Sequence, residues 1–279
     1  MEKAHIQEEH ILETKERSRI RPPIVEENTN GATINARGIF TIVVCYLFMT
    51  FVAASCVLTR LLLLGRGENF CRLYIIKPVF RLLFRVIGIK VSYPTSEIPS
   101  EQVIYTLNHS STMDNFLVAA MGLSNTRYFL SWHSTYKIIP LTITSLLQGT
   151  FYTPSQQDRP ARVKCFQNAE KVLRKTGFST ILSPEGTRVC TGEIGPFNKG
   201  TFHLATKLKV PIVPVYFYIP HHVNSWATFY VKPGHVTIDL LPKIDTSYWS
   251  LDRLDAQREM VRNIYLRHHQ KRHQNDRWS

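Results

Sequence analysis

The stretch VIYTLNHSSTMD, residues 103–114, decides the fold, because a buried strand in it ends in a cluster of polar side chains. Its first five residues are apolar, aromatic or β-branched, which is typical of such a strand. The polar residues after them predict an exit turn and then a helix over residues 112–122, which Ser110, Ser111 or Thr112 could cap. Open α/β sheets usually carry their sites at the carboxyl ends of strands, so this turn is a candidate site.

Short β-rich runs alternate with amphipathic segments from residue 91 onward. The predicted strands are 102–107, 127–131, 149–153, 179–182, 212–217 and 235–241. The predicted helices are 112–122, 135–147, 160–176, 199–207 and 251–268. This alternation predicts an α/β domain over residues 91–268, in which a largely parallel, mixed sheet is flanked by helices.

His109 and Asp114 form a candidate catalytic pair. Residues five apart in a regular helix point about 140° away from each other. His109 can therefore meet Asp114 only from the turn before the helix, with Asp114 in the first helical turns. A carboxylate bonded to one imidazole nitrogen fixes the tautomer and stabilises the cation formed on proton uptake, as a general base for an alcohol requires. The alternative is a capping aspartate beside a histidine that serves only the loop.

The segment SPEGTR, residues 183–188, follows another predicted strand and is the second candidate site. Arg188 offers a planar fork suited to phosphate oxygens. Glu185 could accept a hydrogen bond from a substrate hydroxyl or hold Arg188, and Gly186 permits backbone conformations closed to other residues. Lys199 stands at the start of the next predicted helix, where it could add affinity for an anion. The alternative is a surface turn with a solvated ion pair.

The first 64 residues predict contact with a membrane. Residues 1–38 are polar and mixed in charge, which predicts a flexible arm. Residues 39–64 begin with an uncharged run of 20 residues, IFTIVVCYLFMTFVAASCVL, which matches the thickness of the hydrocarbon core and predicts a membrane helix. A buried core helix is the alternative.

Residues 65–90 predict a basic amphipathic helical segment beside this membrane helix. Its apolar residues recur at helical spacing with four basic residues between them, and Pro78 should kink or divide the helix. Such a segment favours an interfacial position in the headgroup layer, and packing on the catalytic domain is the alternative. The basic residues after the apolar span favour a catalytic domain on the cytoplasmic face.

The formal charge of +13 over 279 residues suits nucleic acid, an anionic membrane surface or an anionic substrate. No nucleic-acid-binding module is visible in the sequence, which favours the last two. The five cysteines have no metal-ligand spacing and fit a reducing compartment, so no metal site is predicted. Residues 269–279 predict a mobile basic tail, and His268, His269 and His273 suggest metal binding less than solvation near anionic lipid.

Three blocks in this order resemble those of the glycerolipid acyltransferase family typified by lysophosphatidic acid acyltransferases. Asn108-His109 with Asp114 is similar to the family's N-H-x4-D block. The segments PEGTR at 184–188 and VPIVPV at 210–215 are similar to its P-E-G-T-R and V-P-I-V-P blocks. Three blocks at familiar spacing are far more specific than any one of them.

The resemblance covers residues 91–241 and implies that His109 deprotonates the free hydroxyl of a lysophospholipid while Asp114 orients it. The acyl donor would be a thioester on coenzyme A or acyl carrier protein, with no cofactor. The acceptor would be 1-acylglycerol-3-phosphate and the product phosphatidic acid. The predicted substrate-binding residues are Asn108, Glu185, Gly186, Thr187, Arg188 and Lys199.

One block departs from the family pattern. The family usually has a phosphate-touching arginine at the position of Ser155, and often a lysine where this chain has Trp132-His133. Arg159 or Arg162 could replace that arginine. The alternatives are therefore an acyltransferase for lyso-ornithine lipid or a zwitterionic lysophospholipid, and a non-catalytic membrane-associated relative. A serine hydrolase is disfavoured, because the sequence has no G-x-S-x-G elbow.

Overall fold

The structure is a computed structural model that describes residues 36–224 and 230–276. The flexible arm predicted for residues 1–38 lies almost wholly outside these residues, as do the last three residues of the predicted tail.

A seven-stranded sheet forms the centre of the domain, in the order β1-β7-β6-β2-β5-β3-β4. Neighbouring strands are parallel except β6 and β7, which confirms the predicted α/β class with a mixed, largely parallel sheet. Tyr105 at the centre pairs with Ile181 of β5 and Val213 of β6. The strands are β1 (Ile89–Ser92), β2 (Ile104–Leu107), β3 (Thr126–Ser131), β4 (Phe151–Thr153), β5 (Ser179–Leu182), β6 (Ile212–Tyr218) and β7 (Gly234–Leu240).

Strand β1 was not predicted, because residues 65–90 were assigned to the amphipathic segment alone. Gly88, with φ of +81°, ends the helical pattern and turns the chain into the strand. Ile89 then pairs with Gly234 of β7. A four-residue strand straight after a helix leaves too short an alternation to be separated from the helical pattern.

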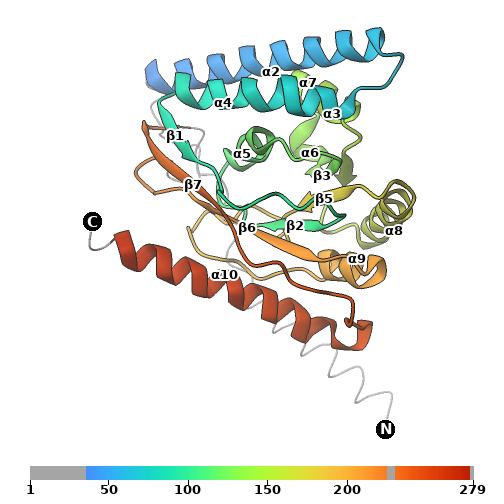
Figure 1. Ribbon diagram of the computed structural model, residues 1–279. Helices are drawn as coiled ribbons and strands as arrows, with labels where there is room; N and C mark the ends of the chain where they lie inside the picture. Colours follow the sequence, from blue (N-terminus) through green and yellow to red (C-terminus); the bar gives the residue numbers. More distant parts are fainter. Residues whose placement is uncertain (1–35, 225–229, 277–279) are drawn as a thin grey trace. The chain divides into compact units, whose positions relative to one another are not determined.

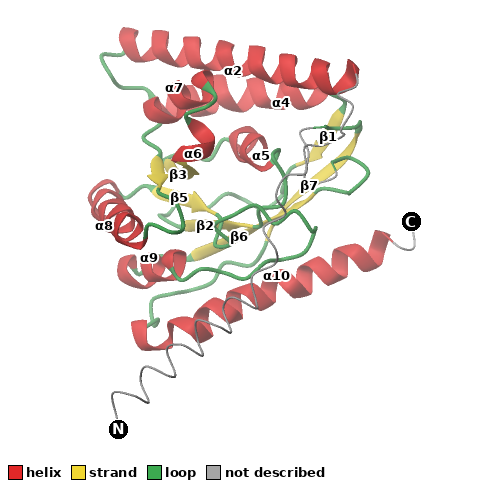
Figure 2. Ribbon diagram, turned by 180° about the vertical axis from the view of Figure 1, so that it is seen from behind, coloured by secondary structure: helices red, strands yellow, loops and turns green. Residues whose placement is uncertain are grey.

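Helices cover both faces of the sheet, as Figures 1 and 2 show. One face carries α5 (Asp114–Met121), and α9 (Gly200–Leu208) and α10 (Leu254–Asp276) lie on the other. The remaining helices of the catalytic domain are α6 (Trp132–Thr135), α7 (Ile139–Leu147), α8 (Arg159–Thr176) and the short 3-10 turn η2 (Leu251–Arg253). The predicted helix over 135–147 begins only at Ile139, as α7 with Pro140 in its first turn, and Thr135 ends the separate helix α6.

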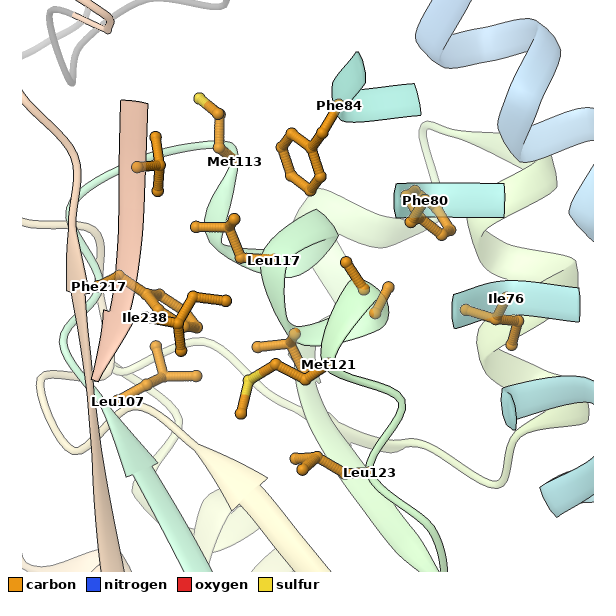
Figure 3. Close-up of a cluster of buried hydrophobic side chains, with 14 of the residues drawn as sticks. Ile76, Phe80, Phe84, Leu107, Met113, Leu117, Met121, Leu123, Phe217 and Ile238 are labelled. Atoms are coloured by element: carbon orange, nitrogen blue, oxygen red, sulfur yellow. The ribbon is translucent and has the colours of Figure 1, made fainter. Parts of the chain in front are cut away.

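The pleat of the strands sorts their side chains between two cores. Tyr105 and Leu107 of β2 belong to the core that α5 covers. Ile104 belongs to the core on the other face, and Thr106 bonds Tyr265 of α10. Figure 3 shows the first core, where Leu117 of α5 lies between Phe217 and Ile238 of the sheet at the left and the rings of Phe80 and Phe84 at the right.

That outer layer is built from the apolar helix α2 (Ala36–Leu62) and a continuous helical segment made of α3 (Glu68–Phe70), η1 (Cys71–Ile76) and α4 (Lys77–Val86). Helix α2 packs against α4 and α7 and is long and apolar enough to cross a membrane. Pro78 lies in the first turn of α4, after a π-helical stretch, so the segment continues through the proline. Ile76, Phe80 and Leu83 are buried against the domain.

The structure shows this stripe packed on the catalytic domain, and the interfacial position of the segment stays a prediction. The apolar residues at helical spacing match the apolar surface of α5, where the Phe80 and Phe116 rings stack with centroids 5.3 Å apart. Burial against a protein surface and burial in lipid require the same stripe, so the pattern alone did not distinguish them.

The prediction of a mobile tail is wrong for residues 269–276, which continue α10. His268 Nε2 lies 2.8 Å from Asp239 Oδ2 of β7, and Arg272 Nε donates to the same oxygen at 2.9 Å. His269 is buried, with Nδ1 2.8 Å from the hydroxyl of Tyr216. The basic residues thus have polar partners on the sheet that lie far away in the sequence.

Candidate active site

His109 and Asp114 meet where β2 passes into α5. His109 lies two residues beyond the last residue of β2, and Asp114 is the first residue of α5. His109 Nδ1 lies 2.7 Å from Asp114 Oδ2. The histidine side chain is 27% exposed and the aspartate side chain 1%, so the carboxylate is shielded while the imidazole reaches the surface. This is the geometry that the five-residue spacing required.

The turn between them is held by its own backbone. Asp114 Oδ2 accepts hydrogen bonds from the N–H groups of Ser110 at 2.9 Å and Ser111 at 3.0 Å. The Ser111 hydroxyl accepts from the N–H of Met113 at 3.0 Å and donates to Asn224 Oδ1 at 2.9 Å. A side chain fixed by three donors at one oxygen has few alternative rotamers, which holds the imidazole partner in place.

Asn108 is a buried link between strands. Its Oδ1 accepts from the N–H of Phe217 at 2.8 Å, and its Nδ2 donates to the carbonyl of the same residue at 3.0 Å. Asn108 is 4% exposed. The amide therefore extends the link between β2 and β6 by one residue, and the contact of Asn108 with substrate stays a prediction.

Glu185 is the buried carboxylate between the two predicted motifs. Its Oε2 accepts from the N–H of His109 at 2.6 Å, and its Oε1 accepts from the N–H of Gly195 at 2.9 Å. The residue is 4% exposed, and burial raises the pKa of its carboxyl to about 7, although the two backbone donors act in the opposite direction. Both oxygens of Glu185 accept backbone N–H groups, which places the carboxyl behind the base, and its contact with the acceptor stays a prediction.

The loop after β5 lies directly against the catalytic turn. The N–H of Val189 donates to the carbonyl of His109 at 2.7 Å, so the loop that carries Arg188 is bonded to the catalytic turn. Gly186 has φ of +71°, and a Cβ there would lie 2.7 Å from Nδ2 of Asn198. Thr187 is exposed and Arg188 is half-buried. Gly186, Thr187 and Arg188 are therefore the predicted substrate-binding residues that the structure brings to the site.

Lys199 and the arginines near Ser155 are placed differently. Lys199 Nζ lies 2.6 Å from Asp255 Oδ2 of α10, in a partly exposed ion pair, and its contact with an anion stays a prediction. Ser155 is exposed in the turn before α8. Arg162 Nη1 donates to the carbonyl of Pro154 at 3.3 Å, whereas Arg159 is exposed in the first turn of α8.

Asn198 and Gly195 complete the site and were missed from sequence. Asn198 donates from its backbone to the carbonyl of Pro184 and from Nδ2 to the carbonyl of Glu185, both at 2.7 Å. Both residues lie just before α9, and their partners Pro184 and Glu185 belong to the other loop, so no local pattern indicates the contact. Among residues 36–224 and 230–276, no group of three or more His, Cys, Asp or Glu side chains could hold a metal ion.

Comparison with known proteins agrees with this geometry. Residues 88–218 match the family model described as Acyltransferase. The chain is 27% identical over 268 residues to the 1-acyl-sn-glycerol-3-phosphate acyltransferase of Limnanthes douglasii, covering 91% of each chain. It is 34% identical over 114 residues to the human 1-acyl-sn-glycerol-3-phosphate acyltransferase beta, covering 39% of this chain and 38% of the human one.

The fold resembles the crystal structure of PlsC, the 1-acyl-sn-glycerophosphate acyltransferase of Thermotoga maritima. The TM-score is 0.66 at 20% identity, over 83% of this chain and 95% of that one. Fold, motif order and family match together define an acyltransferase. The resemblance to glycerolipid acyltransferases, inferred from the three blocks, is confirmed by the family model over residues 88–218 and by the relatives of the same name.

Proposed function

We propose that the chain transfers an acyl group from acyl-CoA or acyl carrier protein to the free hydroxyl of a lysophospholipid, converting 1-acylglycerol-3-phosphate to phosphatidic acid. The observation that carries this proposal is the 2.7 Å contact between His109 Nδ1 and the buried Asp114. The names of the relatives in Limnanthes and in humans support this acceptor.

The reaction follows from the orientation of the imidazole. Asp114 occupies Nδ1 of His109, so Nε2 is the nitrogen that takes the hydroxyl proton of the acceptor. The alkoxide oxygen attacks the thioester carbonyl, and the tetrahedral intermediate collapses with cleavage of the C–S bond. The imidazolium then returns its proton to the departing thiolate. Asp114 stabilises the imidazolium in between and keeps the neutral ring in the required tautomer.

The loop after β5 supplies the binding site for the phosphate of the acceptor. Arg188 follows Thr187 directly, and its neighbour Val189 is bonded to the His109 carbonyl at 2.7 Å, so a phosphate held by Arg188 lies close to the base. The guanidinium fork is suited to two phosphate oxygens at once. A hydroxyl two carbons away from that phosphate would be within reach of Nε2.

Membrane association is the third part of the proposal. Helix α2 exposes a row of apolar side chains on the face turned away from α4 and α7, including Leu47, Phe51 and Leu61 at 60% or more. Trp132 of α6 and Tyr136 directly after it are also exposed, and α6 begins at the carboxyl end of β3, on the edge that carries the site. Tryptophan and tyrosine are favoured at the headgroup level, which suits a lipid acceptor. The basic residues after α2 favour the cytoplasmic face for the catalytic domain.

The direct test is acyl transfer by the protein in vesicles, with labelled acyl-CoA or acyl carrier protein as donor and lysophosphatidate as acceptor. We expect labelled phosphatidic acid from the wild-type protein and none from His109→Ala, with both proteins bound equally to the vesicles. If neither donor acylates any lysolipid while a related enzyme works in the same assay, the proposal is wrong.

A second acceptor class is favoured by one observation. Ser155 is exposed and neutral at the position where the family usually has a phosphate-binding arginine. A lyso-ornithine lipid or a zwitterionic lysophospholipid needs less positive charge at the site. Initial rates on a panel of these acceptors beside lysophosphatidate separate the two classes.

A further inference from the structure

Arg262 of the C-terminal helix α10 contacts the loop behind the catalytic base. Arg262 Nε donates to the carbonyl of Gly195 at 2.9 Å, and its Nη2 donates to the carbonyl of Ile194 at 3.2 Å. Helix α10 lies wholly outside the 88–218 segment that the family model matches and outside the three sequence blocks. Its arginine nevertheless binds two consecutive carbonyls of the loop behind the base.

The second of these bonds acts on the same peptide group that binds Glu185. The carbonyl of Ile194 and the N–H of Gly195 belong to one peptide unit, and that N–H donates to Glu185 Oε1 at 2.9 Å. A cation on the carbonyl polarises the peptide and strengthens its N–H as a donor. Arg262 therefore supports the buried carboxylate without touching it.

Glu185 in turn is hydrogen-bonded to the backbone of the catalytic histidine. Its other oxygen, Oε2, accepts the backbone N–H of His109 at 2.6 Å, and the His109 side chain meets Asp114 at 2.7 Å. Ile194 and Gly195 are buried and Glu185 is 4% exposed, so little water competes for these bonds. The sequence of contacts is Arg262, the Ile194–Gly195 peptide, Glu185 and then the backbone of His109.

Helix α10 is itself fixed to the strand from which His109 emerges. The hydroxyl of Tyr265, three residues after Arg262, lies 2.9 Å from Thr106 Oγ1 of β2 and donates to the carbonyl of Val215 at 3.2 Å. Tyr265 is fully buried. Arg262 thus starts from a helix whose position relative to β2 is set, which is what a positioning residue requires.

We propose that Arg262 is a positioning residue for the base His109, acting through the Ile194–Gly195 peptide and Glu185; this inference rests on the proposed acyl transfer. Loss of the arginine leaves two buried carbonyls without their donor and lets the loop move. A displacement of about 1 Å at a catalytic group costs about 10²-fold in rate. Arg262→Ala should therefore lower kcat by roughly 30-fold to 100-fold, while the KM for the acceptor changes less than about threefold.

The conservative variant separates charge from geometry. Lysine keeps the cation but has no planar fork to reach two adjacent carbonyls, so Arg262→Lys should fold and lose roughly tenfold in kcat. The control is Arg258→Ala, one turn earlier on α10, because Arg258 makes ion pairs with Asp255 and Glu259 at the surface, both at 3.1 Å. Arg258→Ala should stay within about twofold of wild type.

A double-mutant cycle tests the route. Because the effect passes through Glu185, Arg262→Ala should lower kcat less than about threefold in a Glu185→Gln background, whereas two independent sites would multiply their losses. The proposal is overturned if Arg262→Ala and Arg262→Lys keep kcat within twofold of wild type. It is also overturned if the two losses multiply in full.

The same double-mutant cycle can be measured by thermal unfolding, which does not require the protein to be active. Arg262→Ala and Glu185→Gln should lower Tm by less together than the sum of their separate effects, and Arg258→Ala should add independently to Glu185→Gln. If the wild-type protein and the Arg258→Ala control acylate no lysolipid, the proposed function fails. The stability cycle still decides whether Arg262 is coupled to Glu185, and full additivity there overturns the coupling.

Discussion

Replacing Asp114 by asparagine tests whether the charge of this carboxylate, and not its shape, promotes the reaction. Oδ2 alone accepts from His109 Nδ1, Ser110 N and Ser111 N, at 2.7, 2.9 and 3.0 Å. The other oxygen, Oδ1, is buried and has no hydrogen-bond partner in the described part of the chain. An asparagine oxygen can therefore take the Oδ2 position and keep all three bonds, with its NH2 group at the Oδ1 position.

The geometry should survive this change while the negative charge is lost. Two unit charges about 4 Å apart attract by about 4 kcal/mol at an effective dielectric constant near 20. The imidazolium exists only after His109 has taken the acceptor proton, so this attraction stabilises the transition state and not the bound substrates. A loss of about 4 kcal/mol corresponds to a roughly 10³-fold fall in kcat, with KM within about threefold of wild type.

The assay is initial-rate acyl transfer to lysophosphatidate in vesicles, with Tm measured on the same preparations. A buried NH2 group without an acceptor costs about 1–3 kcal/mol, so Tm should fall by only a few degrees. The matched control is Asp245→Asn, because Asp245 is exposed and its oxygens accept from Ser247. A kcat for Asp114→Asn within tenfold of wild type would refute the electrostatic argument. Loss of the cooperative unfolding transition in this variant would refute the geometric one.

Three further predictions concern stability, acceptor binding and the membrane. Burial raises the pKa of Glu185 from 4.5 to about 7, so its stabilising effect is present below pH 4.5 and is lost as the pH rises through 7. Glu185→Gln should therefore flatten the fall of Tm between pH 5 and 7. An unchanged slope of Tm against pH contradicts this. Arg188→Ala should raise the KM for lysophosphatidate about tenfold and leave kcat nearly unchanged, and an unaltered KM removes Arg188 from the phosphate site. Trp132→Ala with Tyr136→Ala should weaken binding to anionic vesicles several-fold in a sedimentation assay, relative to the exposed control Tyr248→Ala, and equal binding excludes α6 from the membrane surface.

Local patterns predicted the strands that carry the site. The run 179–182 is confirmed as β5 to the residue, and the run 102–107 contains β2. A buried strand followed by polar residues and then an amphipathic helix leaves few other arrangements for the chain. The spacing of His109 and Asp114 also required the histidine on the turn and the aspartate in the first helical turn, where both lie.

The sequence did not predict the roles of residues whose partners lie far away along the chain. The chemistry of Glu185 in the PEGTR segment suits a substrate ligand. Its two oxygens, however, accept the N–H groups of His109 and Gly195, which lie 76 and 10 residues away in the sequence. The charge of Lys199 suits an anion ligand, yet in the structure Lys199 forms an ion pair with Asp255. A side chain's chemistry limits what it can bind, and only the approach of other segments selects the partner.

By itself, the sequence of this protein determined the strands and helices that carry the site, the apolar helix near the start and the base with its carboxylate, because each depends on residues within one or two turns of one another. The tertiary structure decided that the amphipathic segment packs on α5, that residues 269–276 extend a docked helix, and that Glu185 lies behind the base. Those outcomes depend on which surfaces come into contact when the chain folds. The free energies of burial and hydrogen bonding between distant segments decide which contacts form.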